Sequence, residues 1–138
     1  MNTNRELRLG FLAGLLTMVV VTVIAATVVV SAMTIASVSA AIGDWEGRID
    51  TGNGSLRVIV HISQAADGRL IGSLDSPDQG STGIATSSAS YNEPDLHFSI
   101  ESLGSSYDGK MNHDNSEITG YWKQSGLSLQ LVFKRRSK

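Results

Sequence analysis

The side chains that could carry out chemistry gather in one short segment, "LDSPDQGSTGI" at residues 74–84, which holds two serines and two aspartates. A serine nucleophile needs a base within hydrogen-bonding reach. The usual serine hydrolases place the serine in a G-x-S-x-G turn between a strand and a helix. That pentapeptide does not occur in the chain. Ser76 and Ser81 are therefore not predicted to be catalytic unless a histidine lies beside them.

None of the three histidines is predicted to lie beside Ser76 or Ser81 as a catalytic base. His61 and His97 fall on the predicted outward faces of two different strands, and His113 falls in a predicted turn. They lack the close sequence spacing of a histidine pair that binds a metal from one element. Cysteine is absent, which excludes a thiolate ligand, a thiolate nucleophile and a disulfide framework. The sequence predicts no catalytic residue, no metal site and no cofactor.

Asp75 and Asp78, on either side of Pro77, could alternatively form the carboxylate pair of a glycosidase, which spans about 5–10 Å across a cleft. In turns, however, aspartates commonly accept hydrogen bonds from exposed backbone N–H groups. Pro77 and Asp78 suit the centre of a type I turn, and Gly80 offers the chain a permissive exit from it. We therefore expect a structured rim loop rather than a catalytic loop.

The residues that must position these groups show the pattern of an all-β protein. Short runs of alternating apolar residues are separated by turn residues, in segments such as "TGNGS", "AADG", "NEPD" and "QSG" that suit hairpins. This rhythm predicts a compact antiparallel β-barrel of about eight strands connected as a meander. The strands are expected at Trp45–Asp50, Leu56–Gln64, Arg69–Leu74, Gly83–Tyr91, Leu96–Glu101, Ser106–Asn112, Glu117–Lys123 and Leu127–Arg135.

The same alternation indicates which residues face the barrel interior. Glycines take several inward positions, each two residues from a large inward side chain; they are Gly47, Gly72, Gly109 and Gly120. Glycine inside a strand permits strong bending and close backbone approach, which a small closed barrel needs. The alternative is that these glycines hollow out a ligand pocket, since a barrel of about eight strands encloses space for side chains or for one small ligand.

The N-terminal third of the chain has the composition of a membrane segment. Residues 9–43 carry no charge, and residues 9–31 exceed the roughly 20 residues with which a helix crosses a bilayer. Basic residues precede this single hydrophobic helix and are expected to stay cytoplasmic, so that the rest of the chain is exported. A second interpretation is a signal peptide cleaved after Ala40. We assign residues 1–41 to a signal anchor or signal peptide with a short linker.

Residues 42–138 are assigned to an extracytoplasmic domain that is periplasmic, at the cell surface, or secreted after cleavage. They contain 12 acidic residues and 9 lysines and arginines, a balance that argues against a nucleic-acid-binding role, so no nucleic-acid partner is expected. The cluster "KRRSK" at residues 134–138 is the exception. It is expected to be a solvated tail or to contact anionic lipid headgroups.

The two tryptophans suggest how the barrel ends are built. "GDWEG" places Trp45 at the start of the first strand, and "TGYW" places Trp122 near the end of the domain, both facing inward. The G-x-W start resembles that of the lipocalin and calycin superfamily. In that superfamily a tryptophan closes one end of the barrel beneath a basic residue of the last strand. The resemblance implies that Arg135 covers Trp45, with Lys134 and Arg136 as the other candidates.

A further resemblance covers nearly all of the exported part. The segments that carry it are "GDWEGRID", "LRVIVHIS", "DGRLIGSLDSPDQGSTGI", "LHFSI", "YDGKMN", "ITGYWKQSG" and "LQLVFKR". Together they resemble a small domain that precedes α/β-hydrolase or peptidase-like catalytic domains in bacterial secreted proteins. The resemblance implies a calycin-like module that accompanies a separately encoded hydrolase, and it carries over no catalytic residue.

From these patterns we expect a membrane-tethered, non-catalytic binding or interaction module. The expected partners are the cytoplasmic membrane through residues 9–31, a hydrolase or another exported protein, and a small apolar ligand. A lipocalin-like carrier is the first alternative and a hydrolase-related enzyme the second. The residues expected at a ligand site or its rim are Trp45, Pro77, Asp78, Gln79, Tyr107, Trp122 and Gln124.

Overall fold

The computed structural model describes residues 38–138, and the predicted membrane helix and residues 9–31 lie outside the described residues. Within residues 38–138, no helix is long and apolar enough to cross a membrane. The described residues belong to a compact unit that begins at Ser37. A short helical turn at residues 38–41 comes first, and the rest is a single β-sheet.

The described part contains nine strands and two single-turn 3₁₀ helices, η1 and η2. The prediction of an all-β domain is confirmed, and seven of the eight predicted strands lie within two residues of observed ones at each end. The elements are β1 (Gly43–Asp50), β2 (Ser55–Gln64), β3 (Leu70–Ser76), η1 (Pro77–Gln79), β4 (Ser81–Ala85), β5 (Ser88–Asn92), β6 (Asp95–Ile100), η2 (Glu101–Leu103), β7 (Ser105–Met111), β8 (Glu117–Gln124) and β9 (Leu127–Arg135).

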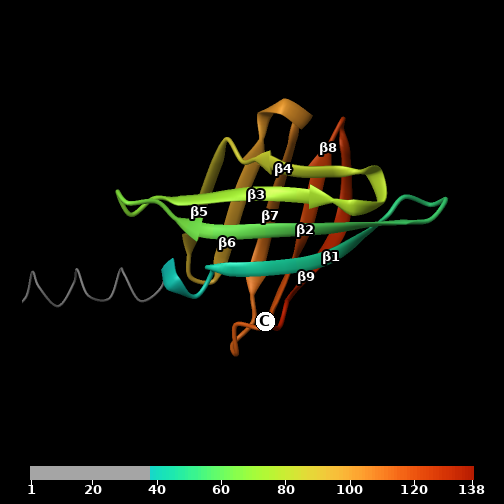
Figure 1. Ribbon diagram of the computed structural model, residues 1–138. Helices are drawn as coiled ribbons and strands as arrows, with labels where there is room; N and C mark the ends of the chain where they lie inside the picture. Colours follow the sequence, from blue (N-terminus) through green and yellow to red (C-terminus); the bar gives the residue numbers. More distant parts are fainter. Residues whose placement is uncertain (1–37) are drawn as a thin grey trace, which may run out of the picture. The chain divides into compact units, whose positions relative to one another are not determined.

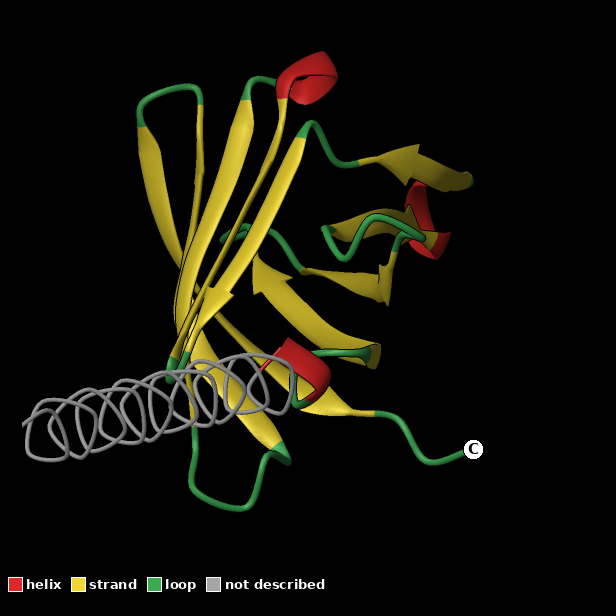
Figure 2. Ribbon diagram, turned by 90° about the vertical axis from the view of Figure 1, so that its left-hand side faces the viewer, coloured by secondary structure: helices red, strands yellow, loops and turns green. Residues whose placement is uncertain are grey.

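All strand pairs are antiparallel, and the sheet order is β4-β3-β2-β1-β9-β8-β7-β6-β5. Every neighbour except the β1–β9 pair is also a neighbour in sequence, as expected for a meander. The sheet curls into a barrel-like form, in which β1 to β4 cross in front of β5 to β9 (Figure 1). Figure 2 shows the same two sets of strands edge-on as two layers.

The prediction of one strand at Gly83–Tyr91 is wrong, because the chain crosses there between the two edges of the sheet. β4 and β5 are separate strands with no ladder between them in the described part. At the crossing, the Thr86 N–H donates to Gly72 O at 2.9 Å and the Ser87 N–H donates to Ser99 O at 2.8 Å. The Thr86 side chain also bonds both backbone groups of Gly72. These bonds join β3 to β6 across the gap where a closed barrel would have a ladder.

Glycines and small polar residues set the turns as predicted. Gly80 ends η1 with φ of 67°, and its N–H donates to Pro77 O at 3.1 Å. The β8–β9 hairpin turns through Ser125 and Gly126 alone, with φ of 52° and 77°. Two consecutive positive φ values are typical of the tight turn whose twist matches that of the flanking strands.

Aromatic side chains fill the middle of the barrel. Tyr107 stacks on Phe98 at 5.3 Å between ring centroids and meets the edge of Phe133 at 5.0 Å. Its hydroxyl donates to Leu131 O at 2.9 Å, which satisfies the one polar atom of a side chain with no exposed surface. Burial raises the pKa of the Tyr107 phenol well above its ordinary value. Tyr107 is therefore a core residue.

Inward glycines let the strands approach one another closely. Gly109 of β7 and Gly120 of β8 lie directly opposite each other. A Cβ atom on Gly120 would lie 2.5 Å from the Cα of Gly109, and one on Gly47 would lie 2.6 Å from Val132 O. Both neighbours are backbone atoms, which cannot rotate away as a side chain can. At these positions the glycines serve packing, rather than the ligand pocket that was the alternative.

We predict that Gly120→Ala lowers the free energy of unfolding by about 3 kcal/mol, because the added methyl group forces β7 and β8 apart. Urea unfolding of the full chain in mild detergent, followed by tryptophan fluorescence, measures this loss. Thr119→Ala, on the exposed face of the same strand, should cost less than about 1 kcal/mol. Equal unfolding midpoints for Gly120→Ala and the unmodified chain would show that the backbone contact does not limit packing.

Candidate functional site

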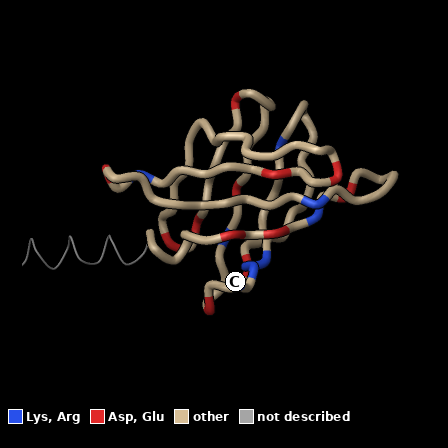
Figure 3. The backbone as a smooth tube through the Cα atoms, viewed as in Figure 1, with Lys and Arg blue, Asp and Glu red and all other residues tan. Residues whose placement is uncertain are grey.

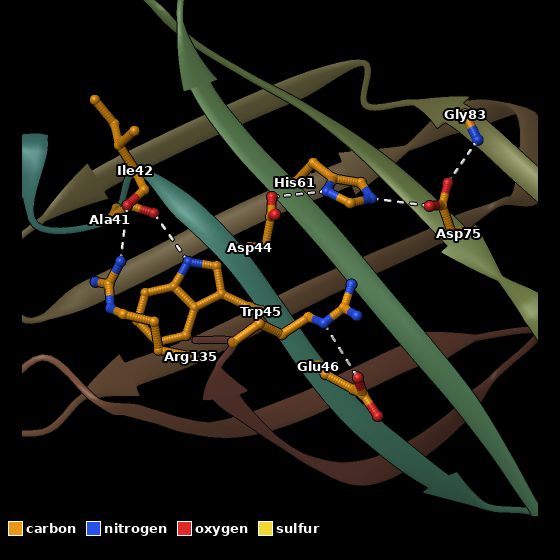
Figure 4. A network of polar contacts seen from close by, with 10 residues as sticks. Ala41, Ile42, Asp44, Trp45, Glu46, His61, Asp75, Gly83 and Arg135 are labelled. Carbon is orange, nitrogen blue, oxygen red and sulfur yellow. Dashed lines mark hydrogen bonds and ion pairs between the residues drawn. The ribbon is translucent and has the colours of Figure 1, made fainter. Parts of the chain in front are cut away.

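One end of the barrel is closed by Arg135 and Trp45, the pairing expected from the sequence. The guanidinium carbon of Arg135 lies 4.1 Å from the centroid of the Trp45 ring, which is fully buried (Figure 4). The ring N–H of Trp45 donates to Ala41 O at 3.0 Å. A cation over a tryptophan face is attracted by the ring quadrupole, and more strongly where water is excluded. We call this region the closed end.

Arg135 also binds three backbone carbonyls there. Its Nη2 donates to Ala40 O at 2.5 Å, its Nη1 to Ile42 O at 2.8 Å and its Nε to Asn115 O at 2.9 Å. Partial burial lowers the pKa of the guanidinium, which nevertheless stays charged at any physiological pH. The planar fork of arginine matches this set of acceptors, which a lysine could not bind together.

The opposite ends of β1 and β9 lead to a pocket of about 340 Å³. We call it the mouth pocket. Its wall is mostly aliphatic, contributed by Ile49 and Val58 near one side and Leu129 near the other. The full lining is Ile49, Thr51, Leu56, Val58, Leu74, Ser76, Gln79, Ser81, Ile84, Leu103, Trp122, Gln124, Ser125, Leu127 and Leu129.

No lining side chain of the mouth pocket carries a charge. Its polar groups already bond one another. Ser76 Oγ donates to Gln79 Oε1 at 2.9 Å, and the Trp122 ring N–H donates to Gln124 Oε1 at 3.1 Å. Gln124 Nε2 in turn donates to Leu103 O at 3.1 Å. The pocket thus combines an apolar wall with neutral donors and acceptors at its edge.

The rim loop at residues 74–84 is a structural element of this mouth. The Asp75 carboxylate accepts the Gly83 N–H at 2.7 Å, and Asp78 accepts the Arg57 N–H at 2.8 Å. The prediction that both aspartates serve as acceptors for backbone N–H groups is confirmed. The bond from Asp78 anchors η1 to β2 and so holds the rim in place.

The structure brings together only some of the predicted site residues. Gln79, Trp122 and Gln124 line the mouth pocket. Trp45 and Tyr107 do not reach it, because the first lies at the closed end and the second in the aromatic core. Pro77 and Asp78 belong to the rim but not to the pocket wall.

A histidine network on the outer face was missed in the sequence. His61 Nδ1 lies 2.7 Å from Asp44 and Nε2 lies 2.8 Å from Asp75, so one imidazole joins β1, β2 and β3 (Figure 4). Asp44 and His61 are opposite each other in the β1–β2 register, a relation that depends on pairing rather than sequence spacing. The two carboxylates raise the pKa of His61, with the bond to Asp75 as the larger cause.

A second outward pair lies on the other layer. His97 Nδ1 lies 2.6 Å from Asp108, which also accepts from Lys123 Nζ at 3.3 Å. These bonds lower the pKa of the Asp108 carboxyl. Within residues 38–138, no group of three or more histidine and acidic side chains has an arrangement that could hold a metal ion.

Comparison with known proteins adds little to this geometry. No protein-family model matches the chain, and no curated protein matches it. Among solved structures, a redesigned β-barrel is similar, with 15% sequence identity and a TM-score of 0.37. That match covers 74% of this chain and 96% of the other. The likeness concerns the barrel-like fold and carries no functional information.

We predict that Arg135→Met lowers the free energy of unfolding by about 2–4 kcal/mol, because three carbonyls lose a charged donor. Arg135→Lys should recover only part of this loss, since an ammonium cannot reach all the acceptors. Arg136→Met is the matched control. It removes one exposed ion pair, Arg136 Nε to Glu46 at 3.4 Å, and should cost less than about 1 kcal/mol. Equal losses for Arg135→Met and Arg136→Met in urea unfolding would contradict the role assigned to Arg135.

We predict that the His61 network makes stability fall as pH rises. Because the folded-state pKa of His61 is raised, its contribution is complete below the unfolded value of 6.5 and is lost as pH rises through the folded pKa. The loss should be less than about 1 kcal/mol, since solvent screens a pair this exposed. Unfolding free energies measured from about pH 6 to 9 test this prediction. His61→Asn should flatten the slope, whereas His113→Asn should not.

Proposed function

We propose that this domain binds a small, uncharged and mainly apolar molecule in the mouth pocket, without transforming it. The observation that carries this proposal is a pocket of about 340 Å³ whose lining includes no charged side chain. Pockets for small molecules typically enclose about 300–1,000 Å³ and combine apolar walls with a few polar groups. The mouth pocket is at the small end of that range.

The electrostatics of the pocket select for neutral ligands. An ionised carboxylate or amine placed there would lose its hydration and find no opposite charge among the lining residues. A hydroxyl, ester or amide would instead meet Gln79, Gln124 and Ser81 at the edge of the pocket. The expected ligand therefore has an aliphatic body and a neutral polar end.

The hydrogen bonds around the pocket support binding rather than catalysis. Ser76 Oγ donates a hydrogen bond to Gln79 Oε1, so this lining serine has an amide partner instead of a base. His61 lies on the outer face, and both of its ring nitrogens are bonded to carboxylates. Neither group is placed to activate a nucleophile in the pocket.

The closed end supports a domain that keeps its N-terminal tether. Cleavage after Ala40 would give Ala41 a new α-ammonium group, although Ala41 has no exposed surface. That charge would replace the peptide group whose Ala40 carbonyl Arg135 binds, and it would lie beside another cation. The retained segment is the predicted span at residues 9–31, which makes the domain extracytoplasmic and membrane-tethered.

A protein partner at the same mouth is the second candidate function. Leu127 is 63% exposed and Leu103 is 36% exposed, and both lie at the edge of the mouth pocket. Exposed apolar side chains beside a pocket are typical of interaction sites. This candidate includes the separately encoded hydrolase implied by the family resemblance. The stack of Arg135 on Trp45 supports the calycin-like part of that resemblance.

Binding can be tested on the domain released from vesicles by a protease site inserted between residues 36 and 37, after the full chain has folded. N-phenyl-1-naphthylamine, a neutral apolar fluorophore, should bind with a micromolar Kd. Decan-1-ol should displace it about tenfold better than decanoate, because only the carboxylate loses hydration without a counter-charge.

Matched variants connect the signal to the mouth pocket. Leu129→Trp fills the pocket and should abolish probe binding, whereas Ile71→Trp, on the outer face, should not change the Kd. Urea unfolding checks that both variants are folded. Two results would overturn the proposal of a neutral ligand at this site. One is probe binding that persists in Leu129→Trp, and the other is displacement of the probe by decanoate as effectively as by decan-1-ol.

A further inference from the structure

A second cavity lies on the outer surface where β1 and β9 meet. The two strands pair through only two residue pairs, Trp45 with Arg135 and Glu46 with Lys134, and their ladder ends there. The opening beside this short ladder is a cleft of about 810 Å³. We call it the seam cleft. Its lining residues are Glu46, Gly47, Arg48, Gln130, Val132, Lys134, Arg135, Arg136 and Ser137.

The seam cleft is basic although the domain as a whole is acidic. Its lining includes four arginines and lysines and one acid, Glu46, which pairs with Arg136. Within residues 38–138, the side chains of Arg48 and Lys134 take part in no ion pair and no hydrogen bond. Arg48 also lies directly opposite Arg57 in the β1–β2 register. Like charges in such positions repel each other, so a bound anion would stabilise this surface.

The cleft adjoins the end of the domain to which the predicted membrane span leads. Arg135, one of its lining residues, binds Ala40 O and Ile42 O. Figure 3 shows basic positions beside the C-terminal end of the chain. Residue 38 follows the end of the predicted span at residue 31 by seven residues, which reach at most about 25 Å when fully extended. The tether thus keeps the cleft within reach of lipid headgroups.

From this placement we infer that the seam cleft binds the anionic phospholipid headgroups of the membrane in which the chain is anchored. Arg48 and Lys134 supply unpaired charges, and Arg136 is shared with Glu46. Each basic side chain near an anionic surface adds about 1 kcal/mol of attraction, an effect confined to roughly a Debye length. Headgroup contact turns the closed end toward the bilayer and leaves the mouth pocket, at the other ends of β1 and β9, facing away from it.

The test separates this contact from anchoring by the span. The full chain, with a protease site between residues 36 and 37, is reconstituted into vesicles of phosphatidylcholine alone or with about 30% phosphatidylglycerol. Flotation with the vesicles before cleavage reports on the span. After cleavage, the fraction of domain that stays with the vesicles reports on the seam cleft. Retention should be at least about tenfold stronger on the anionic vesicles and should be lost at about 1 M salt.

Two variants with the same change of charge give the control. Arg48→Gln with Lys134→Gln should weaken retention by about thirtyfold, because two charges are removed. Lys110→Gln with Lys123→Gln, on the outward face of β7 and β8, should leave it within about threefold. Equal retention on neutral and anionic vesicles would overturn the inference, as would an equal loss in both variants. The salt series needs no substitution, so it decides the question even if a variant fails to fold.

Discussion

The guanidinium of Arg135 is the contact on which the arrangement of the sheet depends. It joins the end of the last strand to the residues that lead into the first one, through Ala40 O and Ile42 O, and it covers Trp45. The ladder between β1 and β9 is too short to define this junction alone, since it has two residue pairs. A backbone bond from Arg136 N–H to Asp44 O at 2.9 Å supports it. Because β1 lies inside the sheet order, its junction with β9 determines how the two layers curl around one interior.

Large aromatic side chains fill the middle and the closed end of that interior, whereas smaller side chains at the other end leave the mouth pocket. Phe98, Tyr107 and Phe133 pack together in the middle, with Trp45 beneath Arg135 at the closed end. Toward the mouth, the inward residues are mainly leucine, isoleucine and serine, and Trp122 is the aromatic side chain that lines the pocket. These side chains leave a pocket of about 340 Å³ between them. A single fold therefore has a sealed end and an open end.

Local patterns in the sequence were sufficient to predict strand faces, turns and the hydrogen bonds of turn residues, because these features depend on local geometry. Alternation of Leu56, Val58, Val60 and Ile62 predicted the inner face of β2, and glycine positions predicted the turns. The roles of Asp75 and Asp78 followed from their place in a turn. The break at Thr86 was missed because small residues on both sides suit a strand equally well, and a tertiary bond to Gly72 decides where the chain turns. The contacts of His61 and the set of residues that line the mouth pocket depend on the register between paired strands. No short segment of the sequence specifies that register.

The junction under Arg135 also determines when the domain can be completed. Its guanidinium bonds Ala40 across 95 residues of sequence, and β1 gains its second neighbour only when β9 exists. As the chain emerges, β1 to β4 can pair in order as hairpins, yet β1 keeps an open edge until the end. Contacts of such long sequence separation are slow to form, and open strand edges are prone to wrong pairing. The fold of this domain is therefore completed only after β9 has been synthesised, and pairing of this strand with β1 is the closing step.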